Sequence, residues 1–296
     1  MSRDLLTGLD EIDWATLEHA FGPAEDTPDL LRRVASGDGG AAAEALGELW
    51  GTIWHQGSVY PATVPAVPFL ARIAAAGVSM PGVLHLLGSI AESSYPRGTE
   101  APSAVHKAVA ACYDVIAPLI NAPDGPTRAA AIFVLAYSGS SERVRPLIVE
   151  RWHSETEPSL RAEALHAMML LDAAAAADLA DEVLSDPASP DGEFLASCAL
   201  AWIRAGRALD ERVLSAALTP LPENSALTHW FEGDDLFGLI VEETAERIDV
   251  ASATDLVDRA LIDSDSHPTA VARQRSDAAK NLIATYRGSM PPSRPA

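Results

Sequence analysis

The densest group of side chains suited to recognition lies in the first quarter of the chain. Trp54, His55, Gln56 and Tyr60 combine aromatic rings with an imidazole and an amide within one short stretch. Aromatic residues are enriched among interface anchors, and the polar groups offer adaptable hydrogen bonds. The group therefore suits a surface that binds another molecule. The alternative is structural: the two rings pack between repeats, and the two polar side chains bond the loop backbone.

A second group follows in the loop from Ser93 to Pro102, which is rich in Ser, Pro and Gly. Tyr95 and Arg97 lie in this loop, and we expect them to project near the same edge as the first group. Loops inserted at one edge of a repeat protein often carry function. We therefore count both residues as candidate partner-binding residues.

No spacing in the chain predicts catalysis or metal binding. No two histidines lie four positions apart, and none has a Cys or Asp at ligand spacing, so we expect no preformed zinc site. His85 and His166 fall on expected inner helices, where a buried or groove-lining role is favoured. Gly37-Asp38-Gly39-Gly40 lacks the Lys-Ser/Thr that follows in a phosphate-binding loop. We expect no catalytic residues, no metal and no cofactor. The eight histidines are His19, His55, His85, His106, His153, His166, His229 and His267.

The chain is strongly acidic. Its 42 Asp and Glu against 21 Lys and Arg give a formal charge of −21, which repels a phosphate backbone and disfavours nucleic acid as a partner. An acidic group near the C-terminus contains a single base, Arg247, and is either a solvated helix face or a surface for a basic partner. Its members are Glu232, Asp234, Asp235, Glu242, Glu243, Glu246 and Asp249.

The cysteines and the N-terminus indicate a cytoplasmic protein. Cys112 and Cys198 each lie in an apolar helical pattern, which favours buried free thiols over a disulfide. The first residues lack both the basic and the apolar region of a signal peptide, and no run reaches the ~20 apolar residues that a membrane span needs. We expect no membrane association.

One theme, a turn followed by a helix of small residues, recurs along the chain. Ala131 and Ala164 lie 33 positions apart (164 − 131), and Ala164 and Ala199 lie 35 apart (199 − 164). A period in this range is typical of a helical solenoid, whose units bury their apolar faces against their neighbours. The four stretches are Gly40 to Trp50, Gly125 to Ala136, Glu157 to Leu171 and Pro190 to Gly206.

The same pattern predicts an all-α fold without strands. We expect one solenoid over residues 1–287, with an N-terminal cap at 1–28 that holds a short helix, the most regular repeats at 125–218, irregular helices at 219–287 and a disordered tail at 288–296. One long helix, Ala104 to Ile120, should kink or end near Pro118. The expected C-terminal helices are Asp234 to Ile248, Thr254 to Ile262 and Pro268 to Tyr286.

The turn, the Arg and the following small residues in 124–131 and 157–165 resemble the second helix of HEAT repeats. The resemblance covers about Asp29 to Leu218 and implies a right-handed superhelix of HEAT-like helix pairs. In that family the Arg, matched here by Arg128 and Arg161, bonds to an acid or a carbonyl of an adjacent repeat. The segment Trp54 to Pro65 is similar to one in bacterial stand-alone HEAT-repeat proteins. HEAT proteins generally bind other macromolecules on the concave surface of inner helices, and fold alone assigns no chemistry.

These observations lead us to expect a non-enzymatic scaffold that binds a protein partner along its inner helices. An alternative is an acidic immunity or inhibitor protein that neutralises a basic partner such as a nuclease toxin. A minor alternative is a HEAT-like enzyme, either a lyase for bilin pigments or a DNA glycosylase. The glycosylase would need a basic groove, which the overall charge disfavours.

Overall fold

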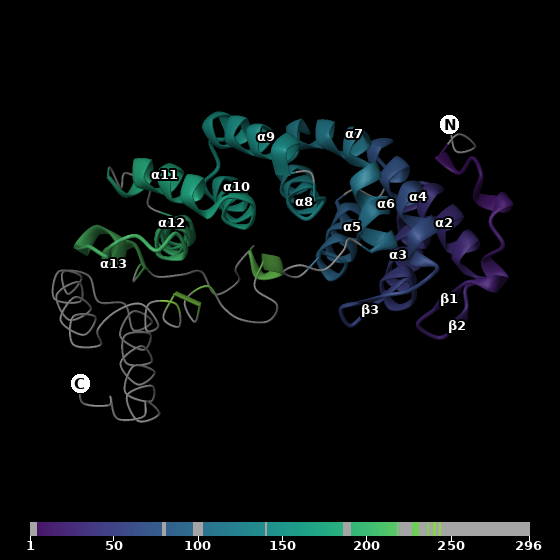
Figure 1. The fold of residues 1–296 in the computed structure, drawn as a ribbon. Helices are drawn as coiled ribbons and strands as arrows, with labels where there is room; N and C mark the ends of the chain where they lie inside the picture. Colours follow the sequence, from purple (N-terminus) through teal and green to yellow (C-terminus); the bar gives the residue numbers. More distant parts are fainter. Residues whose placement is uncertain are drawn as a thin grey trace, which may run out of the picture. The chain divides into compact units, whose positions relative to one another are not determined.

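The structure, a computed structural model, is helical in the residues that it describes, as predicted (Figure 1). These residues are 5–78, 81–96, 103–139, 141–185, 191–217, 219, 227–230, 236, 239, 240 and 243. No helix among them is long and apolar enough to cross a membrane. The helices expected beyond residue 219 fall largely or wholly outside the described residues, and the expected tail at 288–296 does so entirely.

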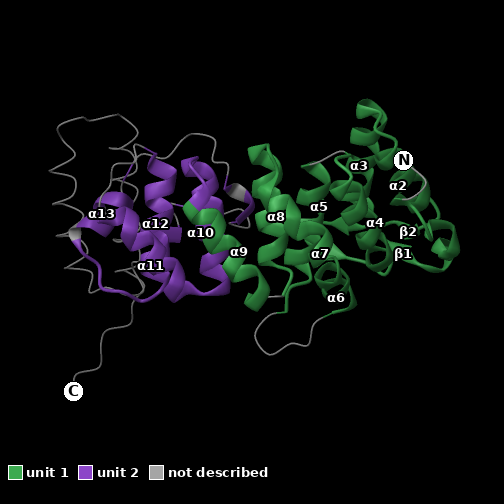
Figure 2. Cartoon of the chain, turned by 90° about the horizontal axis from the view of Figure 1, so that it is seen from above, with its two compact units in different colours: residues 1–153 green, residues 154–296 purple. Residues whose placement is uncertain are grey.

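The chain divides into two compact units, Met1–His153 and Ser154–Ala296 (Figure 2). Each unit is described by itself. The single continuous body over 1–287 stays a prediction.

Unit 1 contains two small hairpins and a series of helices. Its hairpins are β1 (Glu18–His19) with β2 (Gly22–Pro23), and β3 (Trp54–His55) with β4 (Ser58–Val59). Its helices are η1 (Leu9–Glu11), η2 (Trp14–Thr16), α2 (Thr27–Ala35), α3 (Gly39–Thr52), α4 (Thr63–Ala75), α5 (Gly82–Ser93), α6 (Ala104–Ala111), α7 (Tyr113–Ile116), η3 (Ala117–Asn121), α8 (Gly125–Ala136) and α9 (Ser141–Ser154).

Helices of unit 1 pack in pairs and in two layers. The pairs are α2 with α3, α4 with α5, and η3 with α8; α2, α4 and the α6–α7 segment form one layer, whereas α3, α5 and α8 form the other. Helix α9 lies along α7, because the guanidinium of Arg143 sits 3.7 Å from the ring centroid of Tyr113 and pairs with Asp114 at 2.5 Å. Small residues such as Ala130, Ala131 and Ala136 are fully buried and let α8 pack closely.

One glycine decides how closely α5 approaches α8. A Cβ added at Gly88 would lie 2.1 Å from Cδ1 of the buried Phe133, so the phenyl ring occupies the space that any larger residue would need. The absence of a side chain at position 88 therefore permits this contact between the layers.

Unit 2 also contains paired helices. It contains α10 (Pro158–Leu171), α11 (Ala173–Leu184), α12 (Gly192–Arg204), α13 (Glu211–Ala217) and η4 (Thr228–Trp230). Helix α10 packs on α11 and α12, and α12 packs on α11 and α13. Both α10 and α12 are buried along most of their length, which their run of small and apolar residues allows.

Aspartates begin four of these helices. Their carboxylates accept hydrogen bonds from the backbone amide three residues on, which satisfies one of the unpaired amides of a first helical turn. The bonds are Thr127 to Asp124 at 2.9 Å, Ala175 to Asp172 at 3.1 Å, Phe194 to Asp191 at 2.8 Å and Val213 to Asp210 at 3.1 Å. Part of the chain's acidity therefore serves to start helices.

The structure corrects three details of the sequence prediction. In place of a short helix, the described part of the N-terminal cap holds η1, η2 and the β1–β2 hairpin, and η1 follows Gly8, whose φ of 89° is left-handed. The two hairpins are strands where none was expected. The segment Ala104 to Ile120 breaks first at Cys112, before Pro118, and turns to a 3₁₀-helix at Ala117, where the proline lacks an amide hydrogen to continue the α-helix.

Candidate functional site

Four of the six candidate residues lie on or beside the β3–β4 hairpin of unit 1. Trp54 and His55 form β3, and Gln56 and Gly57 form its turn, with φ angles of 48° and 77°. Both angles are left-handed, as a two-residue type I′ hairpin turn requires. The sequence shows Gly57 at the second of these positions, but Gln56 is an unusual residue for the first.

The base of this hairpin is fixed by one threonine. The Thr63 hydroxyl donates to the carbonyl of Ile53 at 2.5 Å and accepts from the backbone amide of Tyr60 at 2.9 Å. Because Thr63 is also the first residue of α4, the hairpin is held between the end of α3 and the start of α4. Tyr60 is half-buried there.

The side chain of Trp54 lies partly at the surface of unit 1 and also contacts helices α3 and α5. Its indole Nε1 donates to the Ser93 hydroxyl of α5 at 2.8 Å, and its ring meets that of Trp50 edge to face at 5.0 Å. The side chain is half-buried. Trp54 thus has the packing role that was the alternative to recognition, and Gln56 is the exposed member of the group, whereas His55 is half-buried.

The most exposed large apolar residue of the described chain, Phe21, lies next to this hairpin. Its side chain is 72% exposed, and its ring centroid is 5.5 Å from that of His55. Backbone hydrogen bonds from Ala20 to Thr52 and from Ala62 to Glu18, each 3.0 Å, join the β1–β2 hairpin to the residues that flank the β3–β4 hairpin. The sequence predicts a short helix in the cap at 1–28, whereas the structure places Phe21 at the turn of the β1–β2 hairpin.

A buried histidine holds the turn that presents Phe21. His19 Nδ1 accepts from the Phe21 amide at 3.1 Å, so this nitrogen carries no proton. Its Nε2 therefore carries the proton and donates to Asp26 at 3.1 Å. The two nitrogens of His19 thus bond the turn residue Phe21 and Asp26, and together these bonds hold the turn in place. We call Phe21, Trp54, His55, Gln56 and Tyr60 the hairpin surface.

The remaining two candidates are placed differently. The ring of Tyr95 packs edge to face against those of His106 and Tyr137, at 5.7 and 5.4 Å. Tyr95 therefore belongs to an aromatic cluster formed with α6 and the end of α8. Arg97 lies outside the described residues.

Unit 2 contains a buried polar cluster that the sequence did not reveal. Glu163 of α10, 3% exposed, accepts from Trp230 Nε1 at 2.6 Å and lies 3.1 Å from His229 Nε2. The Trp230 ring stacks on His166 with centroids 5.8 Å apart. These contacts attach η4 to α10. A carboxylate within the apolar run Ala162 to Leu165 was the available signal.

The cluster includes a serine and a histidine in contact, His166 Nε2 and Ser197 Oγ at 3.0 Å. Ser197 is fully buried, and its hydroxyl donates to the Glu193 carbonyl at 2.8 Å. A hydroxyl has one proton, so His166 Nε2 must carry its own proton and donate to Ser197. The imidazole then cannot take a proton from this serine, and the arrangement is that of a structural bond between α10 and α12.

Burial also sets the charge of His166. Removal from water lowers its pKa well below the ordinary 6.5, and the positive charges of Arg204 and of His229 act in the same direction. Arg204 itself pairs with Glu243 at 2.6 Å. His166 is therefore neutral at pH 7 and fits a buried polar contact.

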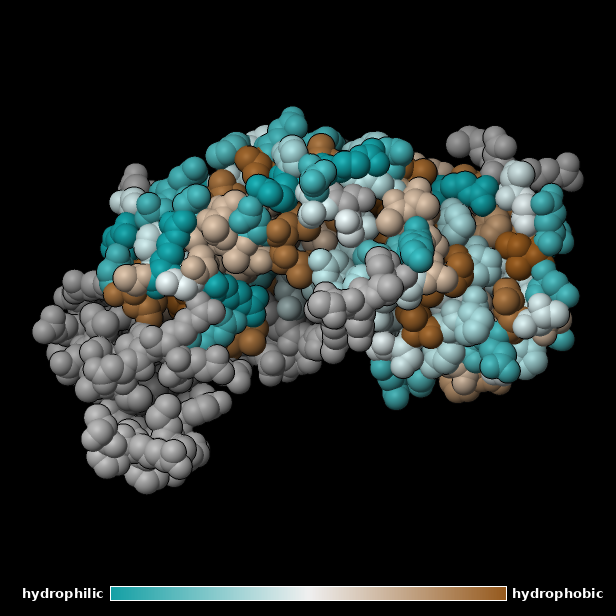
Figure 3. All heavy atoms as spheres, in the orientation of Figure 1, coloured by the Kyte–Doolittle hydropathy of each residue, from teal (hydrophilic) through white to brown (hydrophobic). Residues whose placement is uncertain are grey.

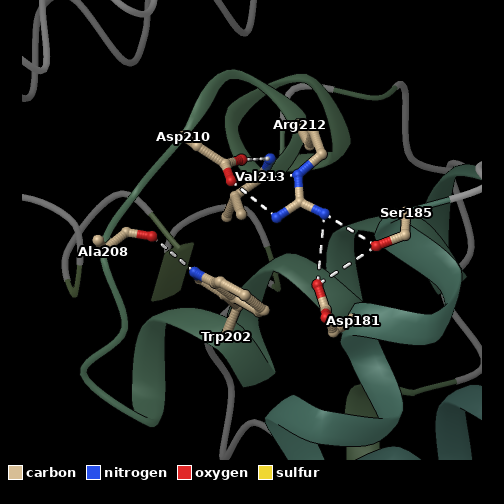
Figure 4. A network of polar contacts seen from close by, with 7 residues as sticks. All are labelled: Asp181, Ser185, Trp202, Ala208, Asp210, Arg212 and Val213. Atoms are coloured by element: carbon tan, nitrogen blue, oxygen red, sulfur yellow. Dashed lines mark hydrogen bonds and ion pairs between the residues drawn. The ribbon is translucent and has the colours of Figure 1, made fainter.

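A surface network joins α11, α12 and α13 (Figure 4). The Arg212 guanidinium donates to Asp210 at 2.8 Å, to Asp181 at 3.3 Å and to Ser185 at 2.9 Å. It lies 5.7 Å from the ring centroid of Trp202, whose Nε1 donates to the Ala208 carbonyl at 2.7 Å. Because Asp181 and Asp210 already pair with Arg212, they are not available to a ligand. The network instead fixes the loop before α13.

Metal and thiol chemistry have little support in the residues that can be described. No group of three or more His, Cys, Asp and Glu among them could hold a metal ion. Cys112 and Cys198 are free and buried, as predicted. Burial raises the pKa of both thiols, which keeps them protonated and unreactive.

Comparison with protein-family models, with curated proteins and with solved structures finds no match to this chain. Its function is therefore argued from its own side chains.

Proposed function

We propose that this chain is a non-enzymatic, cytoplasmic scaffold that binds another protein, and that the partner docks on the hairpin surface of unit 1. The exposure of the Phe21 side chain is the main support for this proposal. Within the described residues, only Phe21 and Leu170 are large hydrophobic residues with exposed side chains, at 72% and 36%. An aromatic ring held in water by a fixed turn, beside the half-buried imidazole of His55, is typical of an interface anchor.

We further propose that the paired helices belong to a HEAT-like solenoid. The layered packing within each unit supports this, because every helix pair covers its apolar faces with its neighbours. The buried Arg128 donates to the carbonyls of Ala122 and Pro123, both at 3.0 Å, and the Arg161 guanidinium lies 5.0 Å from the ring centroid of Phe194 on α12. Arg128 thus bonds to the loop before its own helix, whereas Arg161 packs on a ring of the next helix pair, so only Arg161 links neighbouring repeats.

The inner helices of unit 2 are a weaker candidate for docking. Leu227 is fully buried, and His229 and Trp230 bond to Glu163 on α10. This chain's own segment thus occupies part of α10 where a partner would bind. The hairpin surface has no such cover among the described residues, which favours unit 1.

Substitution of Phe21 tests the proposal. We expect Phe21→Ser to leave the circular dichroism spectrum unchanged, because the side chain is mostly in water, and to reduce recovery of the same partner in affinity capture from native lysate about fivefold or more, equivalent to ~1 kcal/mol. Leu170→Ser, at the other exposed apolar position, is the matched control and should recover the partner as the wild type does.

A second hairpin variant repeats the binding test at the residue next to Phe21. His55→Ala removes the ring beside Phe21 and should weaken recovery of the same partner. Equal recovery by the wild type and by both hairpin variants would exclude the hairpin surface as the docking site. Trp54→Ala is a poorer probe, since it also removes the bond to Ser93 of α5.

A further inference from the structure

Phe21 and the half-buried His55 lie in a strongly acidic stretch of unit 1, a unit that shows hydrophilic residues between hydrophobic ones on the face drawn in Figure 3. Residues 5–62 contain ten Asp and Glu and two Arg, a formal charge of 2 − 10 = −8. A protein segment that covers Phe21 and His55 must approach through this field, which attracts positive and repels negative groups.

Both basic residues of this region are already neutralised by carboxylates. Arg32 contacts Asp10 and Asp29, and Arg33 contacts Glu44 at 2.5 Å and Glu48 at 3.0 Å. The region therefore offers no unpaired cation of its own to an acidic partner.

Two carboxylates beside the β1–β2 hairpin, unlike those that pair with Arg32 and Arg33, have no basic partner among the described residues. Glu18 begins β1, three positions before Phe21, and Glu25 follows β2, four positions after it; both side chains are exposed. Neither has an Arg or Lys partner within the described residues. Together they flank the turn that presents the phenyl ring.

We propose that the hairpin surface binds a positively charged segment of another protein that also carries a large apolar side chain. This inference rests on the proposed function and names the partner's chemistry. The apolar side chain packs against Phe21 and His55, and Arg or Lys side chains pair with Glu18 and Glu25 or lie over the phenyl face. We expect both contacts to contribute, because Glu18 and Glu25 flank the turn that presents the phenyl ring.

Three peptides of equal length test this on the full chain by fluorescence anisotropy. The first alternates Arg and Leu, the second Arg and Ser, and the third Glu and Leu. We expect the Arg–Leu peptide to bind at least tenfold more tightly than either other peptide. Its affinity should fall about tenfold between 50 and 300 mM NaCl, because exposed charge pairs are screened over this range.

Variants assign the binding to the hairpin surface. Phe21→Ser and the double variant Glu18→Gln/Glu25→Gln should each weaken the Arg–Leu peptide about fivefold or more. Leu170→Ser and Glu142→Gln, which remove an exposed apolar and an exposed acidic side chain elsewhere, should leave it unchanged.

The possible outcomes distinguish this inference from the proposed function. Equal binding of the Arg–Leu and Arg–Ser peptides, unaffected by Phe21→Ser, would mean diffuse charge attraction and would overturn the inference. Phe21-dependent binding of the Glu–Leu peptide, or binding insensitive to salt, would also overturn it but leave a protein-binding surface in place. The failure of all three peptides, together with Phe21-independent capture from lysate, would refute both.

Discussion

His166 shows how a residue with catalytic potential is held in a structural role. Its imidazole contacts Ser197, stacks on Trp230 and lies near the charges of Arg204 and His229. The serine's own proton is used by the Glu193 carbonyl, so the pair lacks the proton transfer that activates a nucleophile. A Ser–His contact therefore has to be judged by where each proton goes.

The neutral state of His166 predicts that the stability of unit 2 depends on pH. Its pKa is lowered well below 6.5 in the folded chain, so below pH 6.5 only the unfolded chain takes up the proton. Unfolding is then favoured as the pH falls, by about 1.4 kcal/mol at one pH unit below the unfolded pKa. Above pH 7 both states are neutral and the effect vanishes.

Native-state hydrogen exchange of the α10 and α12 amides measures this effect. After correction for intrinsic exchange, the opening free energy should fall between about pH 7.5 and pH 5.5, and it should fall by ~1.4 kcal/mol less in His166→Leu. The comparison subtracts the titrating groups that lie away from His166, and the coupling of His166 to His229 is part of the measured difference. Equal pH slopes in the two proteins would show that His166 is not held neutral.

At the scale of elements, the capping aspartates explain how the repeats begin. The carboxylate of Asp210 accepts from the Val213 amide at 3.1 Å at the start of α13 and also pairs with Arg212. Although burial acts to raise its pKa, the Arg212 guanidinium and the Val213 amide lower it below the ordinary 3.8. One side chain thus caps a helix and anchors the network of Figure 4.

A pair of alanine variants separates these two roles. Asp210→Ala should destabilise α13 by about 0.5–2 kcal/mol, because it removes the cap. Asp181→Ala removes a carboxylate from the same arginine without touching a cap, and we expect a loss below ~1 kcal/mol. Hydrogen exchange of the α13 amides reports both losses, and an equal loss in the two variants would argue against the capping role.

Most of the helices could be predicted from the sequence, because their apolar residues recur at helical spacing. The stretch Glu157 to Leu171, for example, indicates a turn followed by a helix, and α10 spans Pro158–Leu171 in the structure. The hairpins were missed because each strand has two residues, too few for an alternating pattern. The turn at Gln56 depends on a left-handed φ at a residue that rarely adopts one.

The candidate site was predictable only in part, for a related reason. Trp54, His55, Gln56 and Tyr60 are neighbours in sequence, so a local cluster sufficed to find them. Phe21 joins them through backbone bonds from the β1–β2 hairpin to the residues that flank the β3–β4 hairpin, which no local pattern contains. The Glu163 cluster likewise depends on a contact across 67 positions, from Trp230 to Glu163.

For the whole molecule, the dominant property is a net charge of −21. The 42 acids exceed the bases twofold, so ion pairs such as Arg32 with Asp10 neutralise only part of them. Mutual repulsion of the remainder opposes the compact state. The acids that do not cap a helix or pair with an arginine are therefore a cost to folding, which a function in attracting a basic partner would explain.

This repulsion predicts that salt stabilises the chain. We expect the thermal midpoint to rise by a few degrees between about 20 and 500 mM NaCl, because screening of the net charge outweighs the loss of exposed ion pairs. A variant with exposed acids neutralised, Glu11→Gln/Asp13→Asn/Glu182→Gln, should start from a higher midpoint and respond less to salt. Differential scanning calorimetry measures both, and a midpoint that falls steadily with salt would contradict the prediction.

The contact between Gly88 and Phe133 has a consequence for how this sequence can diverge. Because a Cβ at position 88 would meet the phenyl ring at 2.1 Å, position 88 cannot gain a side chain while Phe133 keeps its place and α5 and α8 stay in contact. A lineage that acquires alanine at 88 must first, or at once, accept a smaller residue at 133. Substitution at position 88 therefore depends on the residue at 133, whereas a smaller residue at 133 is compatible with the present glycine.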